Sequence, residues 1–553
     1  MGKKKNSNNF VMQAGILAAA GIICRIIGIL YRSPLAAVIG DEGNGYYSSA
    51  YEIYTIILLV SSYSIPSAIS KVIAQRLALK EYRNAQKIFR CAIGYVVVVG
   101  GLASLFTFFG AGLLVGGNSI PVLRIFAPTI FFSGLLGVLR GYFQAHGTMV
   151  PTSFSQIVEQ ILNAVVSILA AFLLIKAVSD SDTTTQAVYG ASGSAIGTGS
   201  GVIIALLFML GVFLLNKEYI NRKVKRDNSS QVLSTGEVYK IIITMVTPVI
   251  LSTFIYNFNT SLNLTIYTRI MEHVKGFTEA EAYTQYGLFS GKAKQISNIP
   301  IAIASAMSSA MIPGISGSLA QGDIAGTNRR IGTAIKTTMF LSIPSAVGLT
   351  VLAKPVTLLL YPQKSSVDTV SYLLAAMSIS IIFYALSTIS NAVLQGIGKV
   401  NLPVVNAAVA LVIQTVVLVP LLLTTDLGLY TLVIATVLYS FLMCILNGIS
   451  VKKELKYKQE IIKTFLLPGW AAILMGAAAF GVYHGLYLLI HMNVVCLAAA
   501  ILVAVPIYFV LTIKMGAVGR KDLLALPKGT LFVRIAEKCR LIHYEFHKLL
   551  DFH

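Results

Sequence analysis

Long apolar stretches separated by short polar segments run along the sequence from near its beginning to about residue 514. A helix needs roughly 20 apolar residues to cross a bilayer, so the pattern predicts about fourteen transmembrane helices. They are expected over residues 11–38, 46–75, 91–115, 121–145, 152–177, 187–215, 238–268, 284–314, 331–353, 367–395, 402–424, 428–450, 464–489 and 492–514. The fold class is therefore an all-α integral membrane protein.

A weak internal repeat divides these helices into two sets. Residues 64–69 read SIPSAI and residues 298–303 read NIPIAI, and a Gln-x-x-Gly motif shortly before a proline begins at both Gln144 and Gln395. Because each half has an even number of helices, the halves share one orientation and are related by an axis along the membrane normal. The expected parts are an N-terminal six-helix lobe (1–216), a cytoplasmic linker (217–237), a C-terminal six-helix lobe (238–450), two further helices after a basic loop (451–514) and a tail (515–553). A cleft between such pseudo-symmetric lobes is the expected place for a transported ligand.

Composition agrees with a membrane protein and excludes several other classes. Of the 553 residues, 56% are hydrophobic and 12% are charged, whereas a soluble domain is about one-quarter charged. A secreted disulfide scaffold, a coiled coil and an ordinary cytosolic enzyme are therefore excluded. The five cysteines are scattered and form no CxxC motif, so we expect neither a disulfide framework nor a metal site.

The basic residues predict the topology. The net charge of +21 would suggest nucleic acid in a soluble protein, but in a membrane protein it indicates positively charged cytoplasmic loops. Basic residues gather in alternate loops, in the linker and in the tail, whereas the other loops hold only Lys176, Lys275, Lys354 and Lys364. We therefore expect both termini to be cytoplasmic and no nucleic-acid partner.

Basic residues inside the predicted spans are the main chemical signal. A basic residue at the centre of a membrane helix costs about 2.5–3.5 kcal/mol, so it is expected to face water or an anionic ligand. Five such residues are candidates for a phosphate or pyrophosphate site in the cleft, because both side-chain types bind phosphate oxygens. They are Arg25, Arg32, Lys71, Lys292 and Lys294. The alternative is that each reaches the membrane surface or binds the end of a helix.

Few acidic residues lie inside the spans. Glu159 is expected to pair with Arg140, the alternative being a proton or cation site. Glu52 is expected either to pair with an arginine of the first helix or to be solvated near the outer mouth of the cleft. Asn257 and two nearby asparagines can line a cavity or coordinate an ion, although hydrogen bonding between helices is the simpler interpretation.

No known catalytic or nucleotide-binding motif occurs in the sequence. We therefore expect no enzyme activity, no catalytic residue, no metal and no cofactor. Transport would use an ion gradient, the membrane potential or a substrate moving downhill. In the tail, apolar residues recur from Leu531 with the spacing of an amphipathic helix, which would lie on the inner leaflet or pack against the protein's own cytoplasmic face.

Several short segments together resemble a known family. They are Cys24-Arg25-Ile26-Ile27-Gly28, Gly40-Asp41-Glu42-Gly43, Arg140-Gly141-Tyr142-Phe143-Gln144, Glu159-Gln160 and Leu526-Pro527-Lys528-Gly529. With the predicted spans, they resemble the stage V sporulation protein B and polysaccharide-biosynthesis branch of the multidrug/oligosaccharidyl-lipid/polysaccharide exporter superfamily. Within it, the chain is similar to the MurJ-like lipid II flippases of Gram-positive bacteria.

The resemblance implies a specific transport function. It implies a monomer in the bacterial plasma membrane that moves an undecaprenyl-pyrophosphate-linked peptidoglycan precursor outward by alternating access, near the cell-wall synthesis machinery. In such flippases, arginines in helices 1, 2 and 8 are needed. Arg25 and Arg32 match the arginines of helix 1. Lys71 in helix 2 and Lys294 in helix 8 keep the positive charge but lack the forked guanidinium group. The two helices within 451–514 resemble a groove for the lipid tail. Coupling to a monovalent cation or to the membrane potential stays open.

Three other functions share some of these features. A flippase for another lipid-linked oligosaccharide, from capsule, exopolysaccharide or a teichoic-type polymer, would use the same fold and cations. A cation-coupled multidrug exporter favours an acidic cavity, which the excess of basic residues argues against. A cell-wall scaffold that transports nothing would not need Arg25 or Lys294.

Overall fold

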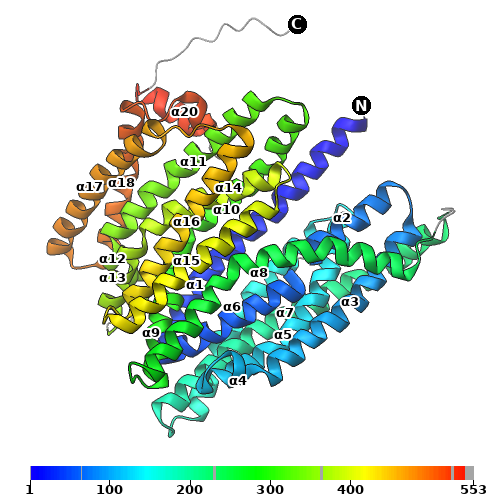
Figure 1. Cartoon of the computed structure of the whole chain (residues 1–553), viewed down its shortest axis with the longest axis horizontal. Helices are drawn as coiled ribbons and strands as arrows, with labels where there is room; N and C mark the ends of the chain where they lie inside the picture. The colour runs from blue at the N-terminus through cyan, green and yellow to red at the C-terminus, as the bar shows by residue number, and fades with distance from the viewer. Residues whose placement is uncertain (1, 64, 228–231, 362–364, 525–528, 542–553) are drawn as a thin grey trace, which may run out of the picture. The chain divides into compact units, whose positions relative to one another are not determined.

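The computed structural model describes residues 2–63, 65–227, 232–361, 365–524 and 529–541. These residues form helices joined by short loops and contain no β-strand, which confirms the all-α prediction. Contacts within the chain divide it into two compact units, residues 1–291 and 292–553 (Figure 1).

The described residues of the first unit form nine α-helices. They are α1 (Gly2–Leu58), α2 (Ile65–Ala78), α3 (Tyr82–Phe109), α4 (Ala111–Leu114), α5 (Ile120–Ala145), α6 (Val150–Ala177), α7 (Thr183–Lys225), α8 (Thr235–His273) and α9 (Glu279–Gly287). Polar residues begin three of them: the Asp182 side chain caps α7, and capping boxes at Ser234 and Thr278 begin α8 and α9. These side chains accept hydrogen bonds from backbone N–H groups that have no partner within the helix.

The second unit contains the remaining helices. They are α10 (Lys294–Ala320), α11 (Ile324–Val351), α12 (Ala353–Leu360), α13 (Val367–Met377), α14 (Ile379–Gly396), α15 (Asn401–Thr424), α16 (Leu429–Leu455), α17 (Leu467–Ile490), α18 (Asn493–Lys514), α19 (Arg520–Leu524) and α20 (Gly529–Lys538). A π-helical turn, Leu288–Ala293, connects α9 to α10 and contains the boundary between the units. Another, Ile462–Leu466, leads into α17.

Most predicted spans coincide with observed helices. Among the described residues, 11 stretches are long and apolar enough to cross a membrane, so the chain is a multi-pass membrane protein. One stretch, Ala19–Ser61, contains most of the first predicted span and part of the second. The predicted span 367–395 consists of α13 and α14, which meet at Ser378.

The unit boundary differs from the lobe boundary expected from the repeat. Helices α8 and α9 pack against α1 and belong to the first unit, although they follow the expected linker, 217–237. Much of that linker is itself helical, because α7 continues to Lys225 and α8 begins at Thr235. Basic side chains favour the C-terminal end of a helix, where the backbone dipole is negative. The division into two six-helix lobes, and the symmetry between them that the repeat implies, therefore remain a prediction.

Small residues bring α6 and α7 into close contact. The spacing of Gly193, Gly197 and Gly201 predicts such packing. A β-carbon on Gly193 would overlap the backbone of Ala171, and one on Gly201 would lie 2.6 Å from the carbonyl oxygen of Glu159. The prediction is confirmed, and the contact holds α7 directly against the helix that carries Glu159.

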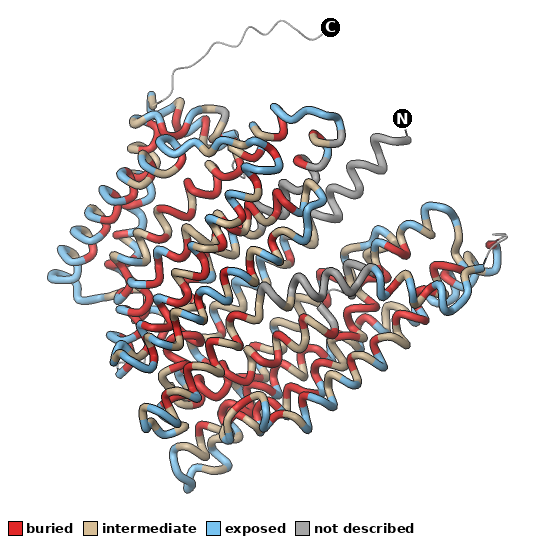
Figure 2. The backbone as a smooth tube through the Cα atoms, in the orientation of Figure 1, coloured by how far each residue is buried: buried red, intermediate tan, exposed pale blue. Residues whose placement is uncertain are grey.

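Helices α17 and α18 pack against each other at one edge of the second unit (Figure 1). They also contact α11 and α12, and their outward faces are exposed (Figure 2). The exposed side chains are large and apolar, including Trp470 and Leu502. Such surfaces suit contact with lipid.

The described part of the tail packs on the second unit. Val533 and Ala536 of α20 are buried, and the ring of Phe532 lies 6.0 Å from that of Phe509 on α18. Phe532, Val533 and Ala536 thus pack against the protein's own helices, whereas Leu531, Ile535 and Cys539 of the predicted apolar stripe are exposed. Residues 526–528 of the family-like segment and the last apolar positions of the tail, 542–553, lie outside the described residues.

Candidate functional site

Gly40 divides α1 into two helical halves. Its φ of 71° and ψ of −178° are not helical, while the residues on both sides continue as helix. A positive φ suits glycine because no β-carbon clashes with the backbone. The first half carries Arg25 and Arg32, which lie nearly two turns apart and therefore on one face. Arg25 is exposed and Arg32 is half-buried.

The first half of α1 contacts α6 beside the predicted ion pair. A β-carbon on Gly28 would lie 3.2 Å from Nε2 of Gln160. The fold thus brings together two of the segments that carry the family resemblance, although they are far apart in the chain.

Arg140 and Glu159 form the ion pair expected from the sequence. Nη2 of Arg140 on α5 lies 2.7 Å from Oε2 of Glu159 on α6, and its Nε donates a hydrogen bond of 2.9 Å to Oγ of Ser155. Both side chains are largely buried, with exposed fractions of 14% and 28%. Hydrogen bonds between charged groups at this distance are strong, so the pair joins two helices of the first unit. Its role in transport remains a prediction.

Glu52 contacts a tyrosine that the sequence did not indicate as a partner. The hydroxyl of Tyr286 on α9 donates a hydrogen bond of 2.6 Å to Oε2 of Glu52. The same hydroxyl lies 3.3 Å from the carbonyl oxygen of Thr260 on α8. Tyr286 therefore links α1, α8 and α9. Asn257, one turn before Thr260, is half-buried, and its contribution to a cavity remains a prediction.

Lys292 is enclosed by protein in this conformation. Its side chain is fully buried in the π-helical turn before α10, and its ammonium donates a hydrogen bond of 3.0 Å to Oγ of Ser366. The ammonium also lies 5.3 Å from the ring centre of Tyr361. Lys294, at the start of α10, is half-buried. A headgroup could reach Lys292 only in another conformation.

The candidate cations are distributed over both units. Arg25, Arg32 and the exposed Lys71 on α2 belong to the first, whereas Lys292 and Lys294 belong to the second. Their convergence on one anionic group therefore remains a prediction.

Glycines bring the second half of α1 against α9. Nδ2 of Asn44 donates a hydrogen bond of 3.3 Å to the carbonyl oxygen of Gly287. A β-carbon on Gly45 would overlap the carbonyl oxygen of Tyr283, and one on Gly287 would overlap the backbone of Gly45. Side chains larger than hydrogen are thus excluded from this contact. The sequence patterns do not indicate this contact, because Gly45 lies between two predicted spans and only Gly287 lies within one.

Polar contacts hold a loop against the same end of α9. Oε1 of Glu279 accepts a hydrogen bond of 2.6 Å from the backbone N–H of Asn118, and the hydroxyl of Tyr283 accepts one of 2.6 Å from the N–H of Gly116. The segment around residue 117 and the α8–α9 loop therefore lie on one side of the unit, as expected for two loops on the same face of a membrane.

Within the described part of the chain, no group of three or more His, Cys, Asp or Glu side chains is placed to hold a metal ion. The groups that the fold brings together are the Arg140–Glu159 ion pair and the hydrogen-bonded Glu52 and Tyr286, whereas the candidate cations are divided between the two units.

Comparisons with known proteins find one family over most of the chain. Residues 83–503 match the family model described as lipid II flippase MurJ. The lipid II flippase MurJ of Bacillus subtilis (strain 168) is 25% identical over 493 residues, which cover 84% of this chain and 86% of that protein. The stage V sporulation protein B of the same organism is 23% identical over 530 residues, covering 94% and 98%.

Solved structures show the same fold. A lipid II flippase MurJ in an inward closed conformation has a TM-score of 0.65 and 16% identity, covering 90% of this chain and 97% of that one. An inward-facing multidrug resistance transporter of the MATE family, from the MOP superfamily, has a TM-score of 0.63 and 15% identity, covering 78% and 94%.

Proposed function

The chain belongs to the lipid II flippase MurJ family, a family of transporters rather than enzymes. On that premise we propose its substrate and the direction of transport. It moves the undecaprenyl-pyrophosphate-linked peptidoglycan precursor, lipid II, from the inner to the outer leaflet of the bacterial plasma membrane by alternating access. Both termini lie in the cytoplasm, and the substrate comes from and returns to the cell-wall synthesis machinery.

The observation that carries this proposal is the placement of arginines on an apolar membrane helix. Arg25 is exposed and Arg32 is half-buried on one face of α1. A sugar-pyrophosphate headgroup cannot cross about 30 Å of hydrocarbon without replacing its hydration. Guanidinium groups supply that replacement because their forked N–H groups match phosphate oxygens. The polyprenyl tail meanwhile stays in lipid.

Alternating access needs a contact that closes one end of the path and can separate. The packing of Gly45 against Gly287 supports such a role, because the two helices meet there without intervening side chains. The hydrogen bonds around it, from Asn44 to Gly287 and from Tyr286 to Glu52, would have to break or exchange partners when the contact separates.

The membrane potential can drive the transport. Each negative charge that moves outward gains about 2.3 kcal/mol per 100 mV of inside-negative potential. The same potential would return an empty cavity lined by cations to the inner side. Collapse of the potential in vesicles should therefore slow flipping, and flipping unaffected by both the potential and ion gradients would exclude this coupling.

A second candidate is the same movement of another lipid-linked glycan. The relative named stage V sporulation protein B covers more of this chain, 94%, than the MurJ relative, 84%. The cationic site would be the same, because the pyrophosphate linker rather than the glycan binds to it.

Genetic complementation distinguishes these functions. A strain depleted of its lipid II flippase would receive the wild type, Arg25→Ala, Lys294→Ala, or Lys453→Ala as an exposed basic control, at matched expression. We expect rescue by the wild type and the control only. Failure of well-expressed wild type would favour the second glycan, and rescue by every variant would exclude the cationic-site mechanism.

A further inference from the structure

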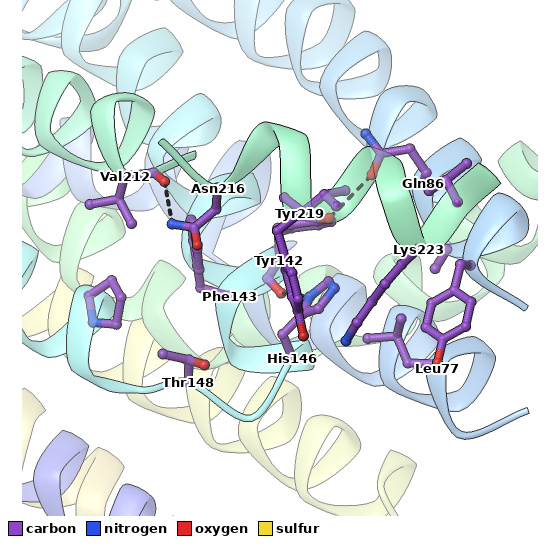
Figure 3. Close-up of a pocket in the computed structure, with 15 residues that line it drawn as sticks. Leu77, Gln86, Tyr142, Phe143, His146, Thr148, Val212, Asn216, Tyr219 and Lys223 are labelled. Carbon is purple, nitrogen blue, oxygen red and sulfur yellow. Dashed lines mark hydrogen bonds between the residues drawn. The ribbon is translucent and has the colours of Figure 1, made fainter. Parts of the chain in front are cut away.

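A separate cavity lies at one end of the first unit, between α2, α3, α5 and α7 (Figure 3). Its volume is about 160 Å³, which is enough for a small headgroup but not for acyl chains. None of the candidate transport residues lines it. The loop between α5 and α6 forms one wall through His146 and Thr148.

The lining is largely apolar, and it contains several aromatic rings and one lysine. Tyr82, Tyr142 and Tyr219 line the cavity together with Lys223. The Lys223 ammonium lies 4.6 Å from the ring centre of Tyr219 and 5.8 Å from that of Tyr82. Such rings attract a cation without neutralising its charge. In Figure 3 the Lys223 side chain extends from α7 toward the part of the cavity where His146 lies.

Two polar side chains of the lining are hydrogen-bonded within the cavity wall. Oε1 of Gln86 accepts a hydrogen bond of 3.2 Å from the hydroxyl of Tyr142. Nδ1 of His146 lies 2.9 Å from the carbonyl oxygen of Tyr142, which makes Nδ1 the protonated nitrogen when the ring is neutral. Among the described residues, no carboxylate forms an ion pair with Lys223. The positive charge therefore has no acidic partner there.

The exposed surface of α7 changes from apolar to basic beside the cavity. Leu214 and Leu215 of α7 are 55% and 87% exposed, as expected for residues in contact with lipid. Exposed basic residues follow within the next three turns: Lys217, Arg222, Lys225 and Arg226. The one acidic residue of α7, Glu218, is exposed. A change from apolar to basic surface is typical of the headgroup level of an anionic leaflet.

We propose that this cavity binds the headgroup of an acidic phospholipid, with the lipid phosphate on Lys223 and the acyl chains along the apolar face of α7. The aromatic rings of the wall contact the glycerol. The site is independent of the transported substrate, because it uses none of the residues assigned to transport.

Lipid binding to the purified full-length protein in detergent tests this site. Native mass spectrometry would compare phosphatidylglycerol with phosphatidylcholine of identical acyl chains. Loss of a charge-assisted contact should weaken phosphatidylglycerol binding about ten-fold in Lys223→Gln. Lys225→Gln removes the same charge from the exposed surface of α7 and should change binding less than about two-fold.

A second variant tests the cavity itself. Thr148→Trp places a large side chain at its rim without changing charge and should also weaken binding, with melting temperatures confirming that each variant is folded. If Lys225→Gln weakens binding equally, general surface charge rather than this cavity attracts the lipid. If phosphatidylcholine binds equally well, the negative charge of the headgroup is not recognised. Glycerol 3-phosphate binding as tightly as the lipid would indicate a soluble ligand. Each of these outcomes overturns the proposal and leaves the transport function untouched.

Discussion

Nη2 of Arg140 and Oε2 of Glu159 lie 2.7 Å apart and join α5 to α6 inside the first unit. Removing either partner leaves the other charge largely enclosed, so Arg140→Gln or Glu159→Gln should each lower the free energy of unfolding by about 1–3 kcal/mol. The double variant removes both charges and should lose less than the sum of the two. Thermal unfolding in detergent measures this double-mutant cycle.

Strict additivity of those two substitutions would show that the pair contributes no coupling. Arg124→Gln is a suitable control, because Arg124 is exposed and its recorded contacts are to Phe108. It should change the melting temperature little.

The close approach of Gly45 and Gly287 predicts a sharp size limit. Alanine at either position places a β-carbon against backbone atoms that cannot move independently, and overpacking of this kind costs about 1–3 kcal/mol. Gly287→Ala should therefore separate α1 from α9. In a cysteine-free background, Ser48→Cys, which is buried in this contact, should then react faster with a thiol reagent.

Gly211→Ala on α7 is the matched control, because no atom lies within 4 Å of the added β-carbon. It should leave the labelling rate unchanged and slightly favour the helix. If Gly287→Ala labels at the wild-type rate, the two helices tolerate the extra carbon and the contact is not size-limited.

Asp522 anchors the beginning of the tail. Its Oδ2 lies 2.7 Å from Nζ of Lys336 on α11 and accepts a hydrogen bond of 2.9 Å from the N–H of Gly519. Asp522→Ala should weaken docking of α19 by about 1–2 kcal/mol and speed proteolytic cleavage after residue 514 about ten-fold. Limited proteolysis measures this rate.

Arg534 is an exposed residue on α20, so Arg534→Gln is a control. If it speeds proteolytic cleavage as much as Asp522→Ala does, altered surface charge rather than the lost Asp522 contacts explains the faster cleavage. The contact between Phe532 and Phe509 should keep α20 partly docked in both variants.

His146 makes the stability of the first unit depend on pH. Burial lowers the pKa of His146, the Tyr142 carbonyl partly opposes this shift, and the ammonium of Lys223 lowers the pKa further. Between the lowered folded value and the unfolded value of about 6.5, the unfolded state binds more protons, so stability is lost as the pH falls through this window. His146→Gln should therefore reduce the dependence of the melting temperature on pH below pH 6.5.

Lys223→Gln should act in the same direction on this pH dependence, because it removes a nearby positive charge. His484→Gln, at an exposed position on α17, should keep the wild-type slope. An unchanged slope in His146→Gln would assign the acid sensitivity to other groups.

The apolar stretches alone determined the membrane class and most helix positions, because a bilayer requires a minimum length and an apolar composition of every spanning helix. The same patterns predicted the Arg140–Glu159 pair, since a buried base and a buried acid both need a partner, and the close packing at Gly193 to Gly201. These features depend on local sequence and on the cost of burying charge. The lack of catalytic motifs likewise pointed away from an enzyme.

Other features depended on which distant segments meet. The contact of Gly45 with Gly287, the hydrogen bond between Glu52 and Tyr286, and the enclosure of Lys292 by Ser366 all join residues far apart in the chain. Hydropathy cannot reveal them, because it records whether a position prefers lipid or water and not which helix lies beside it. The placement of α20 was undecided for the same reason, because an amphipathic stripe fits a lipid surface and a protein surface equally well. The fold packs Val533 and Ala536 against the protein and leaves Leu531 and Ile535 exposed.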